Sequence, residues 1–337
     1  MDIPKILEQL CDLGGVSGGE TEAHDTVLKL LKKYMPDAKA DKFGNVIGFS
    51  GDGDKKPLVL LEAHIDRIGM IVTKIDDDGF LKVSGMGMDR RTLLAQSVTV
   101  FCGEKKIRGV ISTLPPHLAT DSSKVPKIDD IAIDVGMTKE QAEKVVSLGD
   151  LVLIDGFFSK LQGTNVCSPA TDDRAGVCAV LYALDLLKKE KELPCRLAVL
   201  FAAQEEVGCR GSKIGAFSID TDYAIATDVT FAQSNGVDPS EAGELGKGAM
   251  IGISASLSRA VSQKLIGIAK EKNIPWQIEA MDGTTGTDAD SITVSRGGVA
   301  TGLISIPQRY MHTPCEVVDT RDIKAVGELM AEFVKSI

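Results

Sequence analysis

The chain has 337 residues, of which 43% are hydrophobic and 26% are charged, and its formal net charge at pH 7 is −10. This length and composition are typical of two globular domains, and a negative charge without a basic cluster argues against nucleic acid or an anionic membrane as a partner. The hydrophobic runs are too short to cross a bilayer and the N-terminal residues form no signal-peptide pattern, so we expect a cytoplasmic location.

The N-terminal part of the chain predicts two helices and then two strands. Residues 3–13 and 17–35 have helical periodicity, and "SGGE" at the start of the second segment fits a capping box. "GNVIGFSG" and "PLVLLEAHID" follow as strands. The second strand ends at His64, and Asp66 lies two residues later on the same side of an extended chain. His64 is therefore either a core histidine capped by an acid or a metal ligand whose second nitrogen is held by a carboxylate.

A β-rich segment is expected over residues 67–162. Short strands with alternating hydrophobicity recur there, among them "IGMIVTKI", "QSVTVFCG" and "DLVLIDG", and one short helix follows Thr138. The chain then alternates between helices and apolar strands up to a closing helix at residues 322–334. Residues 1–66 and 163–337 together therefore predict one α/β domain, which the β-rich segment interrupts.

The helix that opens the second α/β portion is preceded by two adjacent acids, Asp172 and Asp173. Its apolar residues fall on one side, so we expect an amphipathic helix with a single buried face. Taken alone, the two acids are better explained as an N-cap and a first-turn acid of this helix than as ligands.

Three further segments contain residues that can bind ions. Glu205 and Glu206 directly follow the buried run at residues 197–203, and they face different surroundings because neighbouring side chains on an extended chain point to opposite sides. Asp228 ends another apolar run, where it is explained equally well as a turn residue. His312 lies in "RYMHTPCEVVD", and taken alone it is an ordinary loop histidine.

Nearly all of these side chains lie at the end of a predicted strand of the α/β part. In open α/β sheets the ligand crevice lies at the carboxyl ends of the strands, so we expect the side chains to converge. Seven scattered cysteines without a CxxC pair fit a reducing compartment and disfavour a thiolate site, whereas histidines and carboxylates suit catalytic Zn, Co or Mn. The sequence therefore predicts a site for two divalent ions, built from His64, Asp172, Glu205 or Glu206, Asp228 and His312.

Six fragments occur in this order: "AHIDRIG", "TDDRAG", "AAQEEVGCRGS", "ATDV", "GTDAD" and "PQRYMHTPCEVVD". Together they resemble the dinuclear metallo-aminopeptidases that assemble into hollow tetrahedra, a family that includes glutamyl and deblocking aminopeptidases and proteins called endoglucanases. The resemblance implies a three-layer αβα domain with a mixed sheet, interrupted at residues 67–162 by a barrel-like or PDZ-like dimerisation domain. It also implies a homo-oligomer, a dodecamer built from dimers, whose enclosed active sites admit short peptides.

The same resemblance implies which residues bind the two ions. Asp172 is expected to bridge them. His64 and Asp228 complete the site of one ion in this scheme. Glu206 and His312 complete the site of the other ion.

The resemblance also separates the two adjacent glutamates by role. Glu205 is expected to be the general base, which leaves its neighbour as the metal ligand. Asp66 is expected to orient His64. The peptide bond between Asp172 and Asp173 is expected to be cis.

Two segments bear on substrate preference. "GTDAD" at residues 286–290 is a candidate wall of the substrate pocket by resemblance, and a plain glycine turn explains it equally well. Where members of the family usually have an acid directly after the His-x-Asp core, this chain has Arg67. Arg67 is expected to change the charge at the edge of the site and thereby the substrate preference.

We therefore expect an aminopeptidase that removes the N-terminal residue of short peptides with metal-activated water and Glu205 as the base. A metal-dependent deacylase or carboxypeptidase of the same fold is the first alternative, and Arg67 could bind the substrate carboxylate that a carboxypeptidase recognises. A polysaccharide hydrolase, a glycosidase that uses two carboxylates without metal, is the second, but it leaves His64 and His312 without a role. A peptide-binding scaffold is the third, and it has no need for Glu205.

Overall fold

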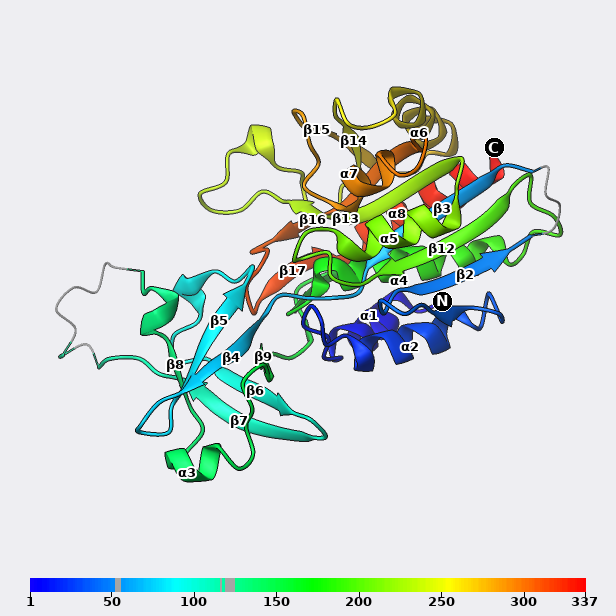
Figure 1. The fold of residues 1–337 in the computed structure, drawn as a ribbon. Coiled ribbons are helices and arrows are strands. Elements are labelled where there is room, and N and C mark those ends of the chain that lie inside the picture. The colour runs from blue at the N-terminus through cyan, green and yellow to red at the C-terminus, as the bar shows by residue number, and fades with distance from the viewer. Residues whose placement is uncertain (52–55, 116, 119–124) are drawn as a thin grey trace.

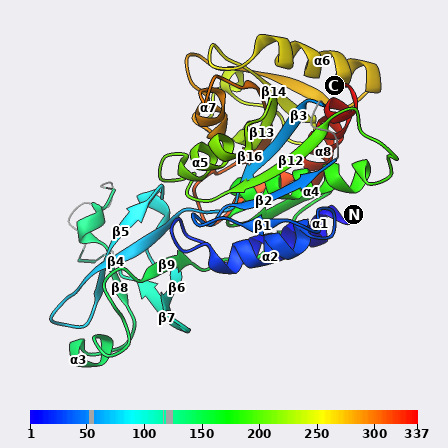
Figure 2. The same cartoon turned by 45° about the vertical axis from the view of Figure 1, so that its right-hand side comes forward.

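The computed structural model describes residues 1–337 except 52–55, 116 and 119–124. The chain forms a large α/β part and a smaller β-barrel, which lies to one side of the α/β part in both views (Figures 1 and 2). The described part of the chain contains no helix that is long and apolar enough to cross a membrane.

The α/β part is built on one mixed sheet of eleven strands. Its main path runs through β1 (Lys39–Ala40), β2 (Val46–Ser50), β12 (Arg196–Ala202), β3 (Leu58–His64), β13 (Tyr223–Phe231), β16 (Ala300–Arg309), β17 (Glu316–Asp319), β11 (Asn165–Ser168) and β10 (Ser159–Lys160). A side branch adds β14 (Ala249–Ile253), which pairs with β16, and β15 (Trp276–Ala280), which pairs with β14. The central strands β12, β3, β13 and β16 are mutually parallel, so their carboxyl ends meet at one edge.

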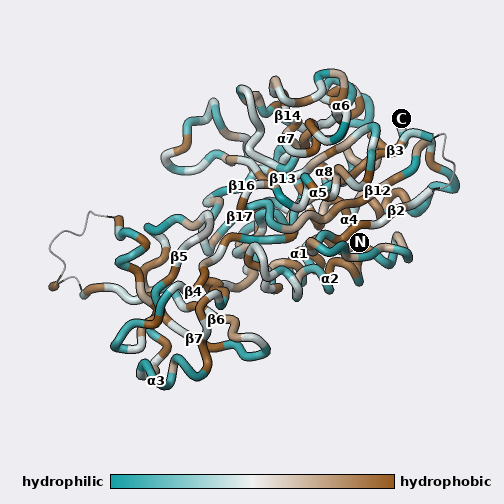
Figure 3. The backbone as a smooth tube through the Cα atoms, in the orientation of Figure 1, coloured by the Kyte–Doolittle hydropathy of each residue, from teal (hydrophilic) through white to brown (hydrophobic). Residues whose placement is uncertain are grey.

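Helices cover both faces of this sheet, which confirms the expected three-layer αβα architecture. One core cluster packs the sheet against α1 (Ile3–Cys11), α2 (Thr21–Leu31), α4 (Thr171–Leu187), α6 (Arg259–Lys272) and α8 (Thr320–Lys335). The other packs it against α5 (Arg210–Ile219) and α7 (Asp288–Thr293). Every residue of β3 is buried, as expected for a strand covered on both faces, and Figure 3 shows the hydrophobic residues concentrated where these elements meet.

Two expectations about the helices are wrong. Helix α4 is buried on almost all sides, and not on a single face, because it lies between the sheet and helices α1 and α8. The capping box expected at "SGGE" does not form. Helix α2 begins at Thr21 without a side-chain cap, and the Ser17 hydroxyl instead donates a hydrogen bond to Asp66 at 2.6 Å.

Six antiparallel strands close into the barrel. In spatial order they are β4 (Gly69–Ile75), β5 (Leu81–Met86), β8 (Ala132–Asp134), β7 (Lys105–Ile111), β6 (Ser97–Cys102) and β9 (Leu151–Ile154). The barrel has an apolar core of its own, and the short helix α3 (Lys139–Ala142) begins with a capping box at Thr138. Strand β10 falls inside the range 67–162 expected for the insertion, but it pairs with β11 in the large sheet.

Candidate active site

The candidate residues come from the carboxyl-terminal edge of the central parallel strands. His64 is the last residue of β3, and Glu205 and Glu206 follow the end of β12. Asp172 lies in the first turn of α4, and His312 follows β16. The chain thus brings together side chains that are far apart in the sequence, at the edge where open α/β sheets bind ligands.

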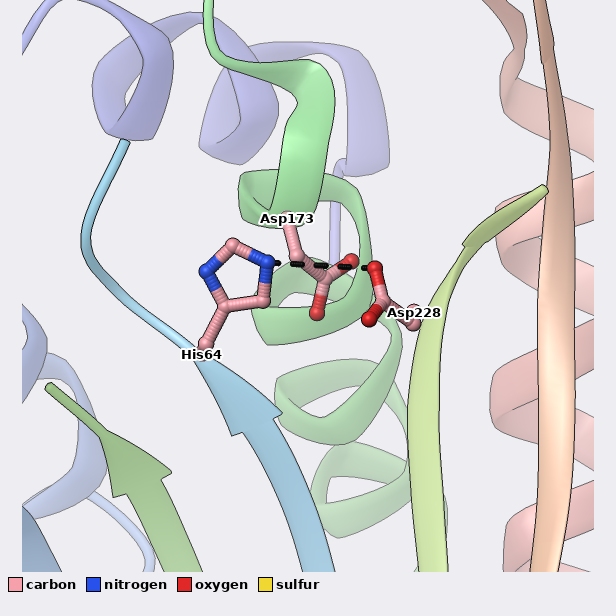
Figure 4. Close-up of side chains that lie close together, drawn as sticks. All are labelled: His64, Asp173 and Asp228. Atoms are coloured by element: carbon pink, nitrogen blue, oxygen red, sulfur yellow. Dashed lines mark ion pairs between the residues drawn. The ribbon is translucent and has the colours of Figure 1, made fainter. Parts of the chain in front are cut away.

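Asp228 lies inside a strand, whereas the sequence predicts it at a strand end. Strand β13 continues to Phe231 because its pairing with β16 extends that far. Asp228 nevertheless projects toward the same edge, since its Oδ1 atom lies 3.8 Å from Nε2 of His64 (Figure 4).

Asp172 lies between the two histidines of the site. Its Oδ1 atom is 3.1 Å from Nε2 of His64, and its Oδ2 atom is 3.3 Å from Nε2 of His312. The same nitrogen of His312 is 3.3 Å from Oε2 of Glu206. The five residues expected to bind metal therefore form two adjoining groups that share Asp172. The Asp172–Asp173 peptide bond is cis, as expected.

Asp173 also belongs to this cluster, although no specific role is predicted for it from the sequence. One potential ligand atom from each of His64, Asp173 and Asp228 lies within 4.8 Å of the others (Figure 4). Asp173 is fully buried, which raises the pKa of its carboxyl group well above the usual value. Its Oδ1 atom accepts the N–H of Gly176 at 2.9 Å, whereas Oδ2 has no hydrogen-bond partner among the described residues.

Asp66 supports three parts of the site at once. Its carboxylate lies 3.5 Å from Nδ1 of His64. It also accepts the backbone N–H groups of Glu205 at 2.9 Å and of Glu206 at 3.2 Å, as well as the Ser17 hydroxyl. Burial opposes ionisation of Asp66, but these contacts lower its pKa overall. Asp66 is therefore placed to orient His64 and to fix the backbone of the two glutamates.

Glu316 gives a second buried support, which the sequence analysis did not identify. Its Oε1 atom accepts the backbone N–H of His312 at 3.0 Å, and its Oε2 atom accepts the backbone N–H of Asp172 at 3.2 Å. Burial raises the pKa of Glu316 to about 8. The only sequence signal for this residue is an acid four positions after His312, which is too common a pattern to indicate such a contact.

Arg67 does not lie at the edge of the substrate site, and this expectation is wrong. Its side chain is only 7% exposed and does not contribute to the lining of the cavity described below. The backbone explains this position, because the Arg67 N–H donates to Gly15 and its carbonyl accepts from Ser17, which pins the residue against the N-terminal segment. Burial lowers the pKa of Arg67, and the negative charge of Glu316 opposes that shift.

The charges of the site fit bound cations. Burial raises the pKa of Glu205 to about 9 and also raises the pKa of Glu206 and of Asp228. Contacts with Asp172 and Glu206 raise the pKa of His312 to about 11. Oε1 of Glu206 is buried and has no hydrogen-bond partner among the described residues. These carboxylates are crowded and oppose one another's ionisation, and one acceptor atom has no donor among the described residues. Bound divalent ions would stabilise the ionised carboxylates and give that acceptor a partner.

The site opens into a cavity of about 890 Å³. Glu205 lines it, and so do Gly286, Thr287 and Asp290 of the "GTDAD" segment. Asp288 of the same segment is instead buried and accepts the Ser212 hydroxyl at 2.5 Å. The segment thus forms part of the cavity wall and part of the packing behind it.

Cys209 is a neighbour of Glu205 that sequence reasoning did not single out. Its thiol donates to Oε1 of Glu205 at 3.3 Å, and it lines the same cavity. One potential ligand atom from each of Glu205, Cys209 and Asp288 lies within 4.8 Å of the others. Both residues lie in the turn between β12 and α5, outside any helix, so helical spacing does not predict this contact.

Comparisons with known proteins identify the family of this chain. Residues 44–329 match the model of the family described as M42 glutamyl aminopeptidase. The chain is 35% identical over 342 residues to the lysyl aminopeptidase of Pyrococcus furiosus, with 99% of this chain and 97% of that one covered.

Solved structures share the whole fold. An aminopeptidase from the archaeon Desulfurococcus kamchatkensis has a TM-score of 0.93 at 36% identity, covering 99% of this chain and 95% of that one. The TET1 peptidase of Pyrococcus horikoshii, which can assemble into a tetrahedron or a large octahedral shell, has a TM-score of 0.87 at 30% identity over 100% of both chains. The family model and these relatives extend over both the α/β part and the barrel, so the chain belongs to the M42 family of aminopeptidases.

Proposed function

We propose that this chain removes the N-terminal residue of short peptides and that it requires two divalent metal ions to do so. The observation that carries the proposal is the position of Asp172, whose two oxygens lie 3.1 Å and 3.3 Å from the Nε2 atoms of His64 and His312. A carboxylate between two histidines suits the bridging of two neighbouring ions. Asp228 would complete the site beside His64, and Glu206 the site beside His312.

The donor set of imidazoles and carboxylates suits Zn, Co or Mn. Such ions, once bound, would polarise the scissile carbonyl and lower the pKa of a water molecule at the site. Glu205 lines the cavity but belongs to neither group around the histidines. The positive charge of bound ions would lower its raised pKa, and the ionised carboxylate would accept the proton of the attacking water. It then gives the proton to the departing amine. Asp66 holds Glu205 for this task through the backbone N–H.

Cleavage after the first residue follows from the charge of the cavity. A free α-ammonium group is attracted to the carboxylates that surround the reacting carbonyl, whereas an N-acylated peptide lacks this charge. We therefore expect free-amine substrates to bind and N-blocked substrates to be poor.

The alternative activities have less support. A carboxypeptidase needs a cation for the substrate carboxylate, but Arg67 is buried away from the cavity, and no lysine or arginine is among the described residues that line it. A glycosidase leaves His64 and His312 without a role, although both lie among the carboxylates of the site. No observation favours a deacylase over an aminopeptidase.

We further propose that residues 67–162 are a dimerisation domain and that the chain forms a dodecamer with enclosed active sites. The support is the tetrahedral assembly of the Pyrococcus horikoshii TET1 peptidase, which matches this chain along its full length. Such a shell admits short or unfolded peptides and excludes folded proteins. The seven unpaired cysteines support a reducing compartment such as the cytoplasm.

The test combines metal removal with a substrate panel. The purified protein is stripped with a chelator, reloaded separately with Zn, Co or Mn, and assayed on aminoacyl anilides, on their N-acetyl forms and on a polysaccharide. The proposal predicts loss of anilide cleavage on stripping, recovery with at least one ion, and no cleavage of N-acetyl substrates. Full activity after stripping, or a preference for N-acetyl substrates, would contradict it. Light scattering tests the dodecamer, which an active monomer would refute.

A further inference from the structure

The cavity that contains the candidate metal ligands has a second wall, and this wall is acidic. Its acids outside the metal-ligand groups and Glu205 are Glu241, Glu279, Asp282 and Asp290. None of the described residues that line the cavity is a lysine or an arginine. The side chain of the first residue of a bound peptide would therefore meet negative charge and neutral groups in this chain.

Glu279 differs from the other three acids of this wall. Asp290 is engaged by its own loop, because it accepts the backbone N–H groups of Thr285 and Gly286. Glu241 and Asp282 are exposed to solvent. Glu279, on strand β15, is half-buried and takes part in no such loop contact.

Two hydroxyl groups hold the Glu279 carboxylate in place. Ser305 on β16 donates to Oε2 at 2.6 Å, and Thr230 on β13 donates to Oε1. Burial raises the pKa of the Glu279 carboxyl group, and the two hydroxyl donors oppose this shift because they stabilise the charged form and fix its direction. Hydrogen-bonded in this way, the side chain is fixed before any ligand arrives.

The two anchors also fix where this charge lies. Ser305 is the register partner of Asp228 on the neighbouring strand, and Thr230 is two residues beyond Asp228 and so on the same face of the sheet. Glu279 therefore lines the same cavity as the metal-ligand groups, on the side of Asp228, and the side chain of a bound first residue would face this wall.

We infer that Glu279 determines specificity by binding the positively charged side chain of an N-terminal lysine or arginine. The inference rests on the proposed aminopeptidase activity and names its substrate class. A lysyl or arginyl side chain would form an ion pair with a prepositioned carboxylate, and its hydrocarbon stem would pass the apolar lining residues Met281 and Leu303. A glutamyl side chain would be repelled by this acidic wall, and no lysine or arginine among the described lining residues offsets that repulsion.

The first test uses the wild-type protein and three anilides, those of lysine, norleucine and glutamate. Norleucine has the same stem as lysine without the ammonium group. We expect kcat/KM for lysine to exceed that for norleucine by about 10- to 100-fold, the usual effect of a hydrogen bond to a charged group. Equal values for lysine and norleucine, or a preference for glutamate, would overturn the inference and leave the aminopeptidase proposal standing. Inactivity on every free-amine anilide with every metal would refute that proposal and this inference with it.

The second test asks whether Glu279 is the source of the preference. Glu279→Gln should lower the ratio of lysine to norleucine by about 10-fold or more, mainly through KM. The matched control is Asp282→Asn, which removes one charge from an exposed position of the same wall and should change the ratio less than about twofold. An equal loss of kcat/KM on both substrates would mean that Glu279 binds the α-ammonium group, which both substrates have, and this would overturn the inference. If Glu279→Gln does not fold, Ser305→Ala removes one anchor and should lower the same ratio.

Discussion

The α/β part and the barrel treat buried charge in opposite ways. Among the described residues between 69 and 154, Thr99 is the only buried polar side chain, and the barrel core is apolar. The α/β part instead buries many ionisable groups, among them Glu62, His64, Asp66, Asp172, Asp173, Arg174, Asp228, Asp288, Glu316 and Asp322. Buried charge destabilises a fold unless it is paired or bound to ions. The barrel is thus stabilised by apolar packing, whereas the α/β part carries the buried charges that form the site.

The largest expected effect comes from Glu205→Gln, which tests the chemical side of this comparison. The amide keeps the shape of the side chain but cannot accept the proton, so kcat should fall about 10²–10⁴-fold while the metal content stays unchanged. Mass spectrometry of bound metal and a rate measurement on the same sample check this. Glu143→Gln, the same change at an exposed position of the barrel, should leave the rate unchanged. Loss of metal from the Glu205 variant would show that Glu205 is a ligand.

The next effect tests the packing side. Leu81 is fully buried in the barrel core, so Leu81→Ala should lower the free energy of unfolding by about 2–5 kcal/mol. Metal content per folded molecule should not change, since the residue is remote from the site. Denaturant titration followed by metal analysis measures both. Leu148→Ala, at a leucine 67% exposed, is the control and should shift stability by less than about 0.5 kcal/mol. An unaltered midpoint for Leu81→Ala would contradict the prediction.

Metal removal should destabilise the α/β part selectively. Ions present at about 100 times their Kd stabilise the folded state by roughly 2.7 kcal/mol, and a chelator removes this contribution while leaving the carboxylates to repel one another. Hydrogen exchange should therefore accelerate in strands β3 and β13 and remain unchanged in barrel strands such as β6. Equal acceleration of hydrogen exchange in the α/β part and in the barrel would contradict the expected selective effect.

The smallest effect concerns a buried acid outside the metal site. Burial raises the pKa of Asp322 to about 6 from 3.8, and its carboxylate accepts the N–H groups of Gly246 and Gly248. The folded state binds the proton more tightly, so the contribution of Asp322 to stability is greatest below about pH 4 and falls as pH rises to about 6. Across this window the stability of wild type should fall about 1–2 kcal/mol more than that of Asp322→Asn. If the stability of wild type and of Asp322→Asn changed equally with pH, Asp322 would not be the source of this pH dependence.

Local pattern was enough to predict much of the fold and several positions in the site. Strands β3 and β12 are continuous apolar runs because helices cover both faces of the sheet, so their ends at His64 and before Glu205 could be located from sequence. The barrel strands alternate in hydrophobicity as expected of a structure with one buried side. The resemblance, and not the spacing, supplied the cis bond at Asp172.

The remaining features depend on tertiary contacts that no local pattern encodes. The contacts of Glu316 with the backbone of Asp172 and of His312 exist only because β17 pairs with both β11 and β16. The sequence predicts Arg67 at the edge of the site, but the residue is buried because its backbone pairs with the N-terminal segment. Asp228 was placed at a strand end because its local sequence does not reveal the long register between β13 and β16.

The pairing of β4 with β9 has a consequence for how the chain is made. The barrel begins at β4 and ends at β9, and these two strands are hydrogen-bonded neighbours, so the chain enters and leaves the insertion at adjacent points. The barrel is then a continuous segment that can fold as soon as it leaves the ribosome. Strand β3 must wait, because its partners β12 and β13 are synthesised more than a hundred residues later. During synthesis the barrel should therefore fold first, while the sheet of the α/β part is still incomplete.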